Sequence, residues 1–335
     1  MRRASLKDVA ARAGVGLGTA SRVMNGSKNV KPITREKVLK AVEELNYHPN
    51  SIARSLKINS TKSLGILLTD LKNGFDTEIV RGIEAEAGKA DYSLFLTNTN
   101  KERSKMLSCI KSFVEKNVDG IIIIGGEITE VFYTSIRQFR IPLITISCES
   151  NIKPEGQYVS ITIDNEQAAY EAVEYLIKKG HRRIAMISGE KDEMNGGIPR
   201  IKGYQRALDR YKIPLREEYL MEGNYTFLSG YERAKQMLAL SERPTAIFAA
   251  SDAMAVGAEK ALLESGVRIP DEIAVFGFDG LDFAEYVYPS LSTVVQPRYE
   301  MGVLAVQCML EFLDAKESKA SKVIVRHQLT VRESG

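Results

Sequence analysis

Four side chains stand shortly after predicted strands, where they could bind a polar ligand. Asp70 and Phe75 follow the first apolar run of the body, Asp252 follows a later run, and Asp279 follows Val275-Phe276-Gly277-Phe278. Ligands in parallel α/β sheets bind beyond the carboxyl ends of the strands. Carboxylates there suit a hydroxyl-rich ligand, which they can hold by paired hydrogen bonds. Asp252 has a second interpretation, because it opens a predicted helix and could be its N-cap.

The sequence contains no motif for covalent catalysis or for metal binding. The three cysteines are widely spaced, and neither they nor the three histidines have the spacing of a zinc-ligand set. Gly125-Gly126-Glu127 follows a predicted strand but lacks the G-x-G-x-x-G pattern, and no phosphate-loop lysine pattern occurs. We therefore expect no enzymatic activity, no metal and no cofactor.

The composition is that of a soluble multidomain protein. The 335 residues are too many for one hydrophobic core, so two or three domains are expected. The sequence has 44% hydrophobic and 27% charged residues, no run of 18 apolar residues, and no apolar segment after its basic N-terminus. Its odd number of cysteines is typical of reduced core thiols. These features predict a cytoplasmic protein without a membrane span.

The net charge of +3 conceals an uneven distribution. Residues 1–62 carry +9, and the remaining residues carry −6. A basic segment attached to a mildly acidic body suggests that the segment binds a polyanion. A solubilising tail is the alternative, but the segment has helix caps and periodic apolar residues rather than low complexity.

The apolar periodicity of the basic segment predicts three short helices. Ser5 would cap the first, with Asp8 in the capping-box position, and Gly14 would end it. A second helix is predicted over about 17–25, and a third begins near Thr34. Two helices joined by a tight glycine turn predict a helix-turn-helix, whose second helix enters the major groove of DNA.

The rest of the chain alternates short apolar runs with amphipathic segments, which predicts α/β structure with parallel sheets. The run Gly120–Ile124 is apolar throughout and must be buried on both faces. The pattern occurs twice, so we expect two doubly wound parallel α/β lobes behind the headpiece. Strands are predicted at 64–68, 92–96, 120–124, 143–146, 183–187, 245–249 and 273–276. Helices are predicted at 78–89, 104–116, 166–179, 200–211, 230–240 and 253–265.

Several motifs of the basic segment are shared with a known family. They are Leu6-Lys7-Asp8-Val9-Ala10, Ala13-Gly14-Val15, Thr19-Ala20-Ser21-Arg22-Val23-Met24-Asn25-Gly26, Thr34-Arg35-Glu36-Lys37-Val38 and Asn46-Tyr47-His48-Pro49-Asn50-Ser51-Ile52-Ala53-Arg54-Ser55-Leu56. In these residues the chain resembles the headpiece of the LacI/GalR family of bacterial transcription regulators. The match covers nearly all of residues 5–57 and continues through the body. It implies a headpiece, a hinge helix and two lobes like those of periplasmic binding proteins.

The resemblance assigns DNA contacts to individual positions. Thr19, Ser21 and Asn25 would contact phosphates, and Arg22 would contact a base, most often guanine through two hydrogen bonds. The complete expected DNA-binding set is Ser5, Leu6, Gly16, Leu17, Gly18, Thr19, Ser21, Arg22, Asn25, Asn29, Val30, Thr34, Tyr47, Asn50, Ala53, Arg54, Leu56 and Lys57.

The same resemblance predicts a hinge helix over residues 50–57. Asn50 would be its N-cap, a role that suits an asparagine on physical grounds as well. Leu56 would enter a minor-groove step as an apolar wedge and kink the DNA. The alternative for Leu56 is that it packs the helix onto its own domain.

Two motifs depart from the family pattern. The recognition helix opens with Gly16-Leu17-Gly18, where the family usually has Ser and two larger base-reading residues. Neither glycine can bond a base through a side chain, so direct readout is thinned there and Arg22 and Leu56 should carry more of it. In the body, Asn73-Gly74-Phe75-Asp76 replaces the usual Asn-Pro-Phe, which puts the geometry of that loop in doubt.

For the ligand site, the resemblance adds Arg200 and Tyr225 to the four residues already singled out. The expected effector-binding set is therefore Asp70, Phe75, Arg200, Tyr225, Asp252 and Asp279. The implied domains are a headpiece at 1–48, a hinge helix and linker at 49–60, a first lobe at 61–161 plus 292–322, and a second lobe at 162–291 plus 323–335.

Some body motifs are similar to the catabolite-control branch of the family. They are Asn29-Val30-Lys31-Pro32, Ile163-Asp164-Asn165-Glu166-Gln167-Ala168-Ala169, Lys202-Gly203-Tyr204 and Val294-Val295-Gln296-Pro297. That branch takes a serine-phosphorylated HPr-like carrier protein as corepressor on the first lobe, where Arg298 and Tyr299 would lie in the matching region.

The whole sequence predicts a ligand-responsive repressor of carbohydrate or related catabolic genes. It would bind a pseudo-palindromic operator in double-stranded DNA as a homodimer, controlled by a sugar, sugar phosphate or purine-like effector between the lobes. A phosphoprotein corepressor is the alternative. A sugar-binding protein without DNA function is more remote, because it would lack residues 1–60.

Overall fold

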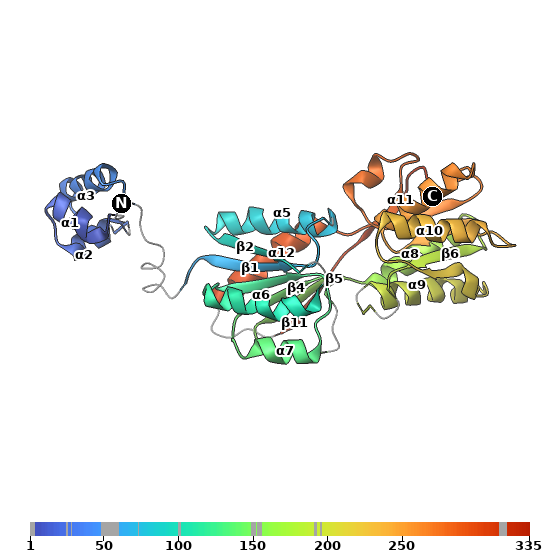
Figure 1. The fold of residues 1–335 in the computed structure, drawn as a ribbon, viewed down its shortest axis with the longest axis horizontal. Helices are drawn as coiled ribbons and strands as arrows, with labels where there is room; N and C mark the ends of the chain where they lie inside the picture. Colours follow the sequence, from blue (N-terminus) through green and yellow to red (C-terminus); the bar gives the residue numbers. More distant parts are fainter. Residues whose placement is uncertain are drawn as a thin grey trace. The chain divides into compact units, whose positions relative to one another are not determined.

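The computed structural model describes residues 4–24, 26–27, 29–47, 60–72, 74–99, 102–148, 152, 156–190, 193–194, 196–314 and 320–335 (Figure 1). The chain divides into two compact units, Met1–Lys62 and Ser63–Gly335. The division falls at residue 62, where the charge also changes from the basic segment to the acidic body.

The first unit, the headpiece, contains three short helices around a small core. They are α1 (Leu6–Ala13), α2 (Leu17–Met24) and α3 (Pro32–Glu44). The predicted capping box is confirmed, because the Ser5 side chain accepts from the Asp8 amide and the Asp8 carboxylate accepts from the Ser5 amide. Gly14 ends α1 with a φ of 67°, as the glycine C-cap predicts. The core consists of Val9, Ala10, Ala20, Val23, Val38 and Ala41.

The third helix begins two residues before the predicted start. Pro32 occupies its first turn, where a missing amide hydrogen costs nothing and the φ of proline is already helical. Asn46 follows the helix with a φ of 44°. The predicted hinge helix at 50–57 lies outside the described residues.

The first lobe of the body is a six-stranded parallel sheet covered by helices. Its strands are β1 (Ser63–Leu68), β2 (Ser93–Asn98), β3 (Gly120–Ile124), β4 (Leu143–Ile146), β5 (Tyr158–Ile163) and β11 (Ser321–Val325). Their order is β11-β5-β4-β3-β1-β2, and every pair is parallel. The helices are α5 (Gly74–Lys89), α6 (Arg103–Glu115), α7 (Glu130–Arg137) and α12 (Arg298–Asp314).

Alternate residues of this sheet enter two separate cores. Ile122 and Ile124 of β3 pack with α5 and α12, whereas Ile121 and Ile123 pack with α6 and α7. All five residues of β3 are buried, which confirms the prediction that this apolar run is covered on both faces. The helices therefore form one layer on each side of the sheet.

The second lobe repeats this plan. Its strands are β6 (Ile184–Ser188), β7 (Leu220–Glu222), β8 (Ala246–Ala249), β9 (Ala274–Asp279), β10 (Ser292–Val295) and β12 (Gln328–Thr330). The order is β12-β10-β9-β8-β6-β7, parallel except that β12 runs antiparallel to β10. The helices are α8 (Asn165–Lys178), α9 (Gly197–Arg210), α10 (Phe227–Leu238) and α11 (Asp252–Glu264), with 3-10 turns at Glu217–Tyr219 and Asp282–Glu285.

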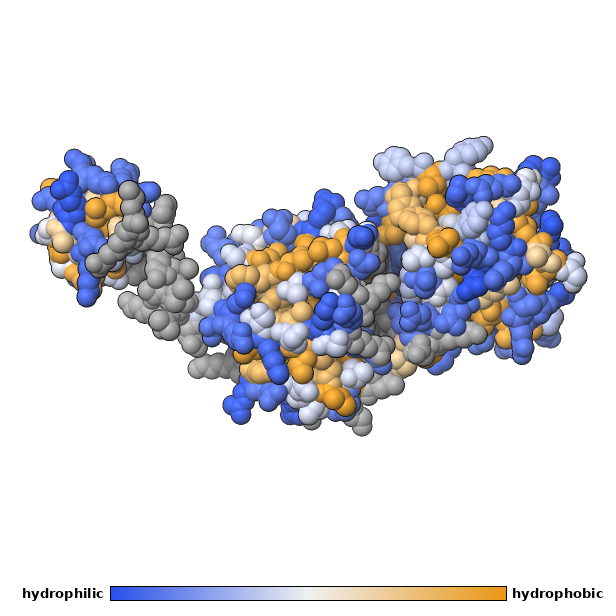
Figure 2. Space-filling model, viewed as in Figure 1, coloured by the Kyte–Doolittle hydropathy of each residue, from blue (hydrophilic) through white to orange (hydrophobic). Residues whose placement is uncertain are grey.

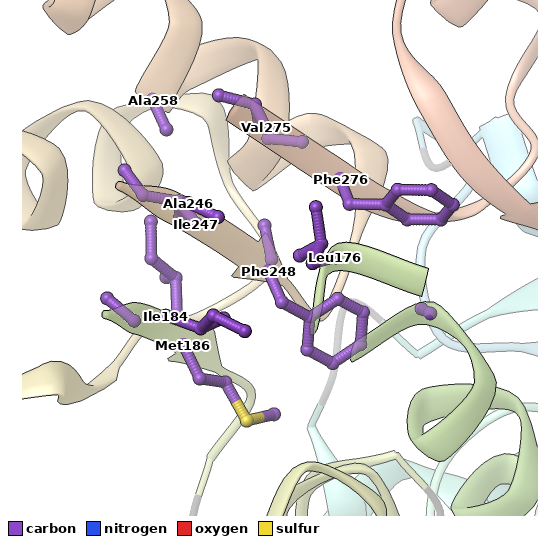
Figure 3. Packing of buried hydrophobic residues seen from close by; sticks show 14 of the residues in the cluster. Leu176, Ile184, Met186, Ala246, Ile247, Phe248, Ala258, Val275 and Phe276 are labelled. Atoms are coloured by element: carbon purple, nitrogen blue, oxygen red, sulfur yellow. The ribbon is translucent and has the colours of Figure 1, made fainter. Parts of the chain in front are cut away.

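The core of the second lobe is dense and large. Figure 3 shows Phe248 of β8 and Phe276 of β9 packed with Leu176 of α8, all of them buried. Met186 and Ile247 belong to the same cluster. Buried apolar area of this extent supplies most of the stability of such a sheet.

The chain passes between the lobes at positions that differ from the expected boundaries. β5 extends to Ile163 in the first sheet, and β10 pairs with β9 of the second sheet although we expected residues 292–295 in the first lobe. The chain returns to the first lobe at α12 and remains in it through β11, which ends at Val325. Strand pairing sets these positions, and a resemblance in sequence does not reveal it.

Candidate functional site

The start of α2 forms one exposed face of the headpiece. Gly16, Leu17 and Gly18 are exposed there, while Ala20 and Val23 of the same helix are buried. Leu17 is 45% exposed, which leaves its side chain available for an apolar contact. The helix therefore presents a face with few side-chain hydrogen-bonding groups.

Arg22 supplies the strongest polar group on this face. Its side chain is exposed, its Nε donates to the Gly18 carbonyl at 3.2 Å, and its Nη2 donates to Thr19 Oγ1 at 3.4 Å. These two weak contacts lay the guanidinium along the helix toward its N-terminus. An arginine held in this way keeps donors for two hydrogen bonds to a guanine edge.

The remaining described residues of the expected DNA-binding set surround α2. Ser5 is occupied in capping α1, and Leu6, Val30 and Tyr47 pack on the headpiece core. Asn29 is exposed, while Thr19, Ser21 and Thr34 are half-buried. Six predicted contacts lie outside the described residues: Asn25, Asn50, Ala53, Arg54, Leu56 and Lys57.

The two glycines at the start of α2 are not equivalent. The amides of Thr19 and Ala20 donate to the Gly16 carbonyl, so Gly16 is the N-cap, and only Gly18 lies within the helix. A glycine at an N-cap costs only a few tenths of a kcal/mol relative to serine. The full cost of about 1 kcal/mol for a glycine inside a helix therefore applies to Gly18 alone.

We expect Gly18→Ala to stabilise the headpiece by up to about 1 kcal/mol, because alanine loses less backbone entropy in a helix. A Cβ at Gly18 would meet no atom within 4 Å, so nothing opposes the gain. Thermal unfolding of the full chain followed by circular dichroism measures it. Gly14→Ala is the matched control and should destabilise, since Gly14 has a φ of 67°.

In the body, Arg200 of α9 is buried among polar and aromatic partners. It is 5% exposed, its Nε donates to Asn165 Oδ1 at 3.0 Å, and its Nη1 donates to the Ala250 carbonyl. Its guanidinium carbon lies 3.7 Å from the centroid of the Phe278 ring, within the range of a cation–π contact. The side chain is therefore held rigidly at the carboxyl ends of the second-lobe strands.

Asp279 ends β9 beside this arginine. Its Oδ1 accepts from Gln296 Nε2 at 2.9 Å and lies 3.8 Å from Arg200 Nη2. Burial raises the pKa of Asp279 to about 6, although the charge of Arg200 opposes the rise. Its φ of 117° lies where only glycine is comfortable, and residues in such conformations cluster at functional sites.

Tyr225 also has an unusual backbone, with a φ of 63°. Its hydroxyl donates to a carboxylate oxygen of Glu193, and burial raises its pKa well above the ordinary value. A Cβ at Gly189 would lie 1.8 Å from this hydroxyl oxygen. The glycine therefore makes room for the tyrosine next to Arg200.

Asp252 is placed differently from both interpretations offered by the sequence. Ser251 is the N-cap of α11, so Asp252 is not. The Asp252 carboxylate is fully buried, accepting from the Leu281 amide at 2.6 Å and from Thr293 Oγ1. Burial raises its pKa to about 8. It ties the turn after β9 to α11 and has no surface on which to meet a ligand.

The two first-lobe candidates are also largely occupied. Phe75 is 8% exposed and belongs to the core beneath α5, and Asp70 accepts from the Lys72 amide at 2.9 Å. The more distinctive side chain is Asp76, which is 2% exposed and accepts from Thr69 Oγ1 and the Asp70 amide. Burial raises the pKa of Asp76 to about 7, and the charges of Asp70 and Asp279 add to the rise.

Sequence reasoning did not single out the residues that orient this cluster. Asn165, Gln296, Phe278 and Asp76 support Arg200 and Asp279 or face them electrostatically. A signal was present, because Asn165 and Gln296 lie in motifs that carried the family resemblance.

Arg298 links the two lobes. Its Nη1 donates to the Gly74 carbonyl of α5 at 3.1 Å, and its Nη2 donates to the Gly280 carbonyl at 2.6 Å and to Asp282 at 3.0 Å. It is 7% exposed. Arg298 is therefore an internal residue, although we expected it in a region that meets a corepressor.

Comparisons with known proteins cover the whole chain. Residues 5–50 match bacterial regulatory proteins of the lacI family, and residues 173–335 match the periplasmic binding protein-like domain. The chain is 37% identical over 330 residues to catabolite control protein A of Priestia megaterium, covering 98% of each. It is 39% identical over 333 residues to the HTH-type transcriptional repressor PurR of Vibrio atlanticus (strain LGP32), covering 99% of this chain and 98% of the relative.

Solved structures give the same result. A lac repressor dimer bound to operator and the anti-inducer ONPF aligns with a TM-score of 0.89 at 27% identity, covering 99% of both chains. A complex of the transcriptional regulator CelR with cellobiose aligns with a TM-score of 0.75 at 30% identity, covering 99% of this chain and 100% of that one. Within the described residues, no helix is both long and apolar enough to span a membrane. The helix-turn-helix headpiece, the paired α/β lobes and the full-length relatives together show that the chain belongs to the lacI family of bacterial regulatory proteins and is a DNA-binding transcription regulator.

Proposed function

We propose that the chain is an allosteric repressor of carbohydrate or related catabolic genes, with a small hydroxyl-rich effector bound at Arg200 and Asp279. The main support for an effector at this position is the buried pair itself. Arg200 Nη2 lies 3.8 Å from Asp279 Oδ1. That separation is longer than a direct hydrogen bond. A ligand hydroxyl can accept from the guanidinium and donate to the carboxylate at the same time.

The chemical class of the effector follows from these groups. Arginine, a carboxylate and the Tyr225 hydroxyl offer donors and acceptors in alternation, and Phe278 supplies an apolar face beneath the guanidinium. Sugars match this pattern, and sugar phosphates and purine-like molecules share parts of it. One aligned structure is a cellobiose complex, and several relatives carry the name HTH-type transcriptional repressor PurR. Asp252 and Phe75 act as supports in this proposal rather than as contacts.

Repression would act through a homodimer. Two headpieces would bind the halves of a pseudo-palindromic operator, and the hinge segments would bend the DNA. Effector binding would shift one lobe against the other and change operator affinity by a coupling free energy. Arg298, which spans Gly74 and Gly280, lies where such a shift must be accommodated. We place the protein in the bacterial cytoplasm and propose that it works without catalysis.

The corepressor alternative receives less support from the structure. A phosphorylated HPr-like carrier protein would need accessible side chains in the region of Arg298 and Tyr299. Arg298 is buried, and Arg81 lies over the Tyr299 ring at 5.9 Å. Absence of binding in a pull-down with the serine-phosphorylated carrier would remove this alternative.

A thermal-shift screen of sugars, sugar phosphates and purines on the full chain tests the effector proposal. We expect one class to raise the unfolding temperature, because a ligand that binds only the folded state stabilises it by mass action. Asp279→Asn should weaken that ligand about tenfold, since one charged acceptor is lost.

Asp282→Asn is the matched control, because Asp282 is exposed and pairs with Arg298 rather than with Arg200. Equal affinities for the two variants would show that the ligand binds elsewhere. Loss of specific DNA binding by the unmodified chain would instead contradict the regulator function itself.

A further inference from the structure

A cavity opens at the edge of the first lobe opposite to the candidate effector residues. Its walls include residues at the amino ends of three strands, Ile121 of β3, Leu143 of β4 and Tyr158 of β5. Residues of α6 and α7, such as Ile110 and Ile136, also line it. Its volume is about 490 Å³. Asp70 and Asp76 lie after the carboxyl end of β1, so a parallel sheet separates the two locations.

The floor of this amino-edge cavity is apolar. Ile110, Ile121, Tyr133 and Leu143 are between 1% and 6% exposed, yet they face a hollow of this size. The rings of Tyr133 and Tyr158 meet edge to face with centroids 5.8 Å apart. The volume falls in the range of small-molecule sites.

The mouth of the cavity carries positive charge. α7 ends at Arg137, and the next turn places Arg140 in the left-handed region with a φ of 54°. Both arginines line the cavity and are exposed, and among the described residues no hydrogen bond or ion pair engages the Arg140 guanidinium. Figure 2 shows apolar residues among hydrophilic ones on the visible face of the first lobe. An apolar pocket with a cationic rim suits a ligand that is apolar at one end and anionic at the other.

We propose that the amino-edge cavity is a second ligand site, which binds a small amphipathic anion with an aromatic or branched apolar body. The body of the ligand fills the space between Tyr133, Tyr158 and the isoleucines. Its carboxylate, sulfonate or phosphate lies at Arg140. The site is independent of the effector proposed at Arg200 and Asp279, because no residue is common to the two.

Fluorescence titration of the full chain with 8-anilinonaphthalene-1-sulfonate tests this proposal. This probe has an apolar aromatic body and one anionic group, and we expect saturable binding of one molecule per chain. Arg140→Gln should weaken it about three- to tenfold, as for loss of one partly solvated charge contact. The uncharged N-phenyl-1-naphthylamine should bind the variant and the unmodified chain equally.

Lys202→Gln is the matched control for charge, because Lys202 is exposed on α9 of the second lobe and is not among the residues that line the cavity. It should leave the affinity unchanged. Ile141→Trp places a bulky side chain at the half-buried edge of the cavity and should reduce binding of both probes at least tenfold. Circular dichroism and DNA binding confirm that each variant is folded.

Location is tested by energy transfer, because the chain contains no tryptophan. Phe139→Trp, in the cavity wall, should transfer excitation to the bound sulfonate more strongly than Phe227→Trp in α10 of the second lobe. Equal transfer from both positions, or sulfonate affinities unchanged by Arg140→Gln and Ile141→Trp, would overturn the proposal.

Discussion

Arg22→Ala reduces specific operator affinity by about 1–3 kcal/mol, roughly 5- to 150-fold, while leaving non-specific DNA binding nearly unchanged. The size of the effect follows from the sparse chemistry around Arg22. Gly16 and Gly18 have no side chain, and Leu17 offers only apolar contact, so few other groups on α2 can compensate. The guanidinium is exposed and held against Thr19, which reduces the entropy lost when it binds a base.

The measurement is an electrophoretic titration against an operator selected by the unmodified protein, compared with random DNA at the same salt. Lys40→Ala is the matched control, since Lys40 is an exposed cation on α3. It should weaken both DNAs together, as for a loss of general electrostatic attraction. If Arg22→Ala also weakens both DNAs together, α2 does not read the operator through this arginine.

The body becomes less stable as pH rises from about 5 to 8. Glu259 of α11 is 2% exposed, and its Oε1 has no hydrogen-bond partner among the described residues. Burial, with a contribution from the charge of Asp252, raises the pKa of Glu259 from 4.5 to about 8. Between these values the folded state holds a proton that the unfolded state releases, so the unfolding free energy falls with pH and levels off above pH 8.

Glu259→Gln removes this titrating group and should reduce the slope of the profile, while Asp76, Asp252 and Asp279, whose pKa values are also raised, keep the remainder of it. We expect the variant to match the unmodified protein at pH 5 and to be about 2–4 kcal/mol more stable than it at pH 8, because a buried carboxylate no longer has to be charged. Denaturant unfolding at the two pH values measures the difference. Glu264→Gln, an exposed residue of the same helix, is the control. Parallel profiles for Glu259→Gln and the unmodified chain would contradict the assignment.

The regular elements of the chain could be predicted because their physics is local. The capping box at Ser5 and Asp8 needs only residues three apart, and the apolar run of β3 needs only its own composition. α7, α12 and β5 received no prediction, and β10 was assigned to the wrong sheet. The sheet to which a strand belongs depends on pairing across more than a hundred residues, as when β11 pairs with β5.

Only part of the candidate effector site could be predicted, because some of its contacts join residues that are distant in the sequence. Arg200 and Asp279 are brought together; the position after a predicted strand indicated Asp279, and the family resemblance indicated Arg200. Asp252 looked like a ligand residue because it follows a strand, but its carboxylate is occupied by Leu281 and Thr293, which lie on distant segments. Its close approach to β9 depends on Gly277, where a Cβ would lie 2.3 Å from Asp252 Oδ1. Such long-range contacts leave no periodic signal in the sequence.

The interleaving of the lobes has a consequence for synthesis. The first sheet needs α12 and β11, and the second sheet needs β12, so neither lobe can be completed before about residue 330 has left the ribosome. The core of the headpiece is formed by α1, α2 and α3. The headpiece can therefore fold while more than two hundred residues remain to be made. During translation the DNA-reading unit can therefore fold before either lobe of the body is complete.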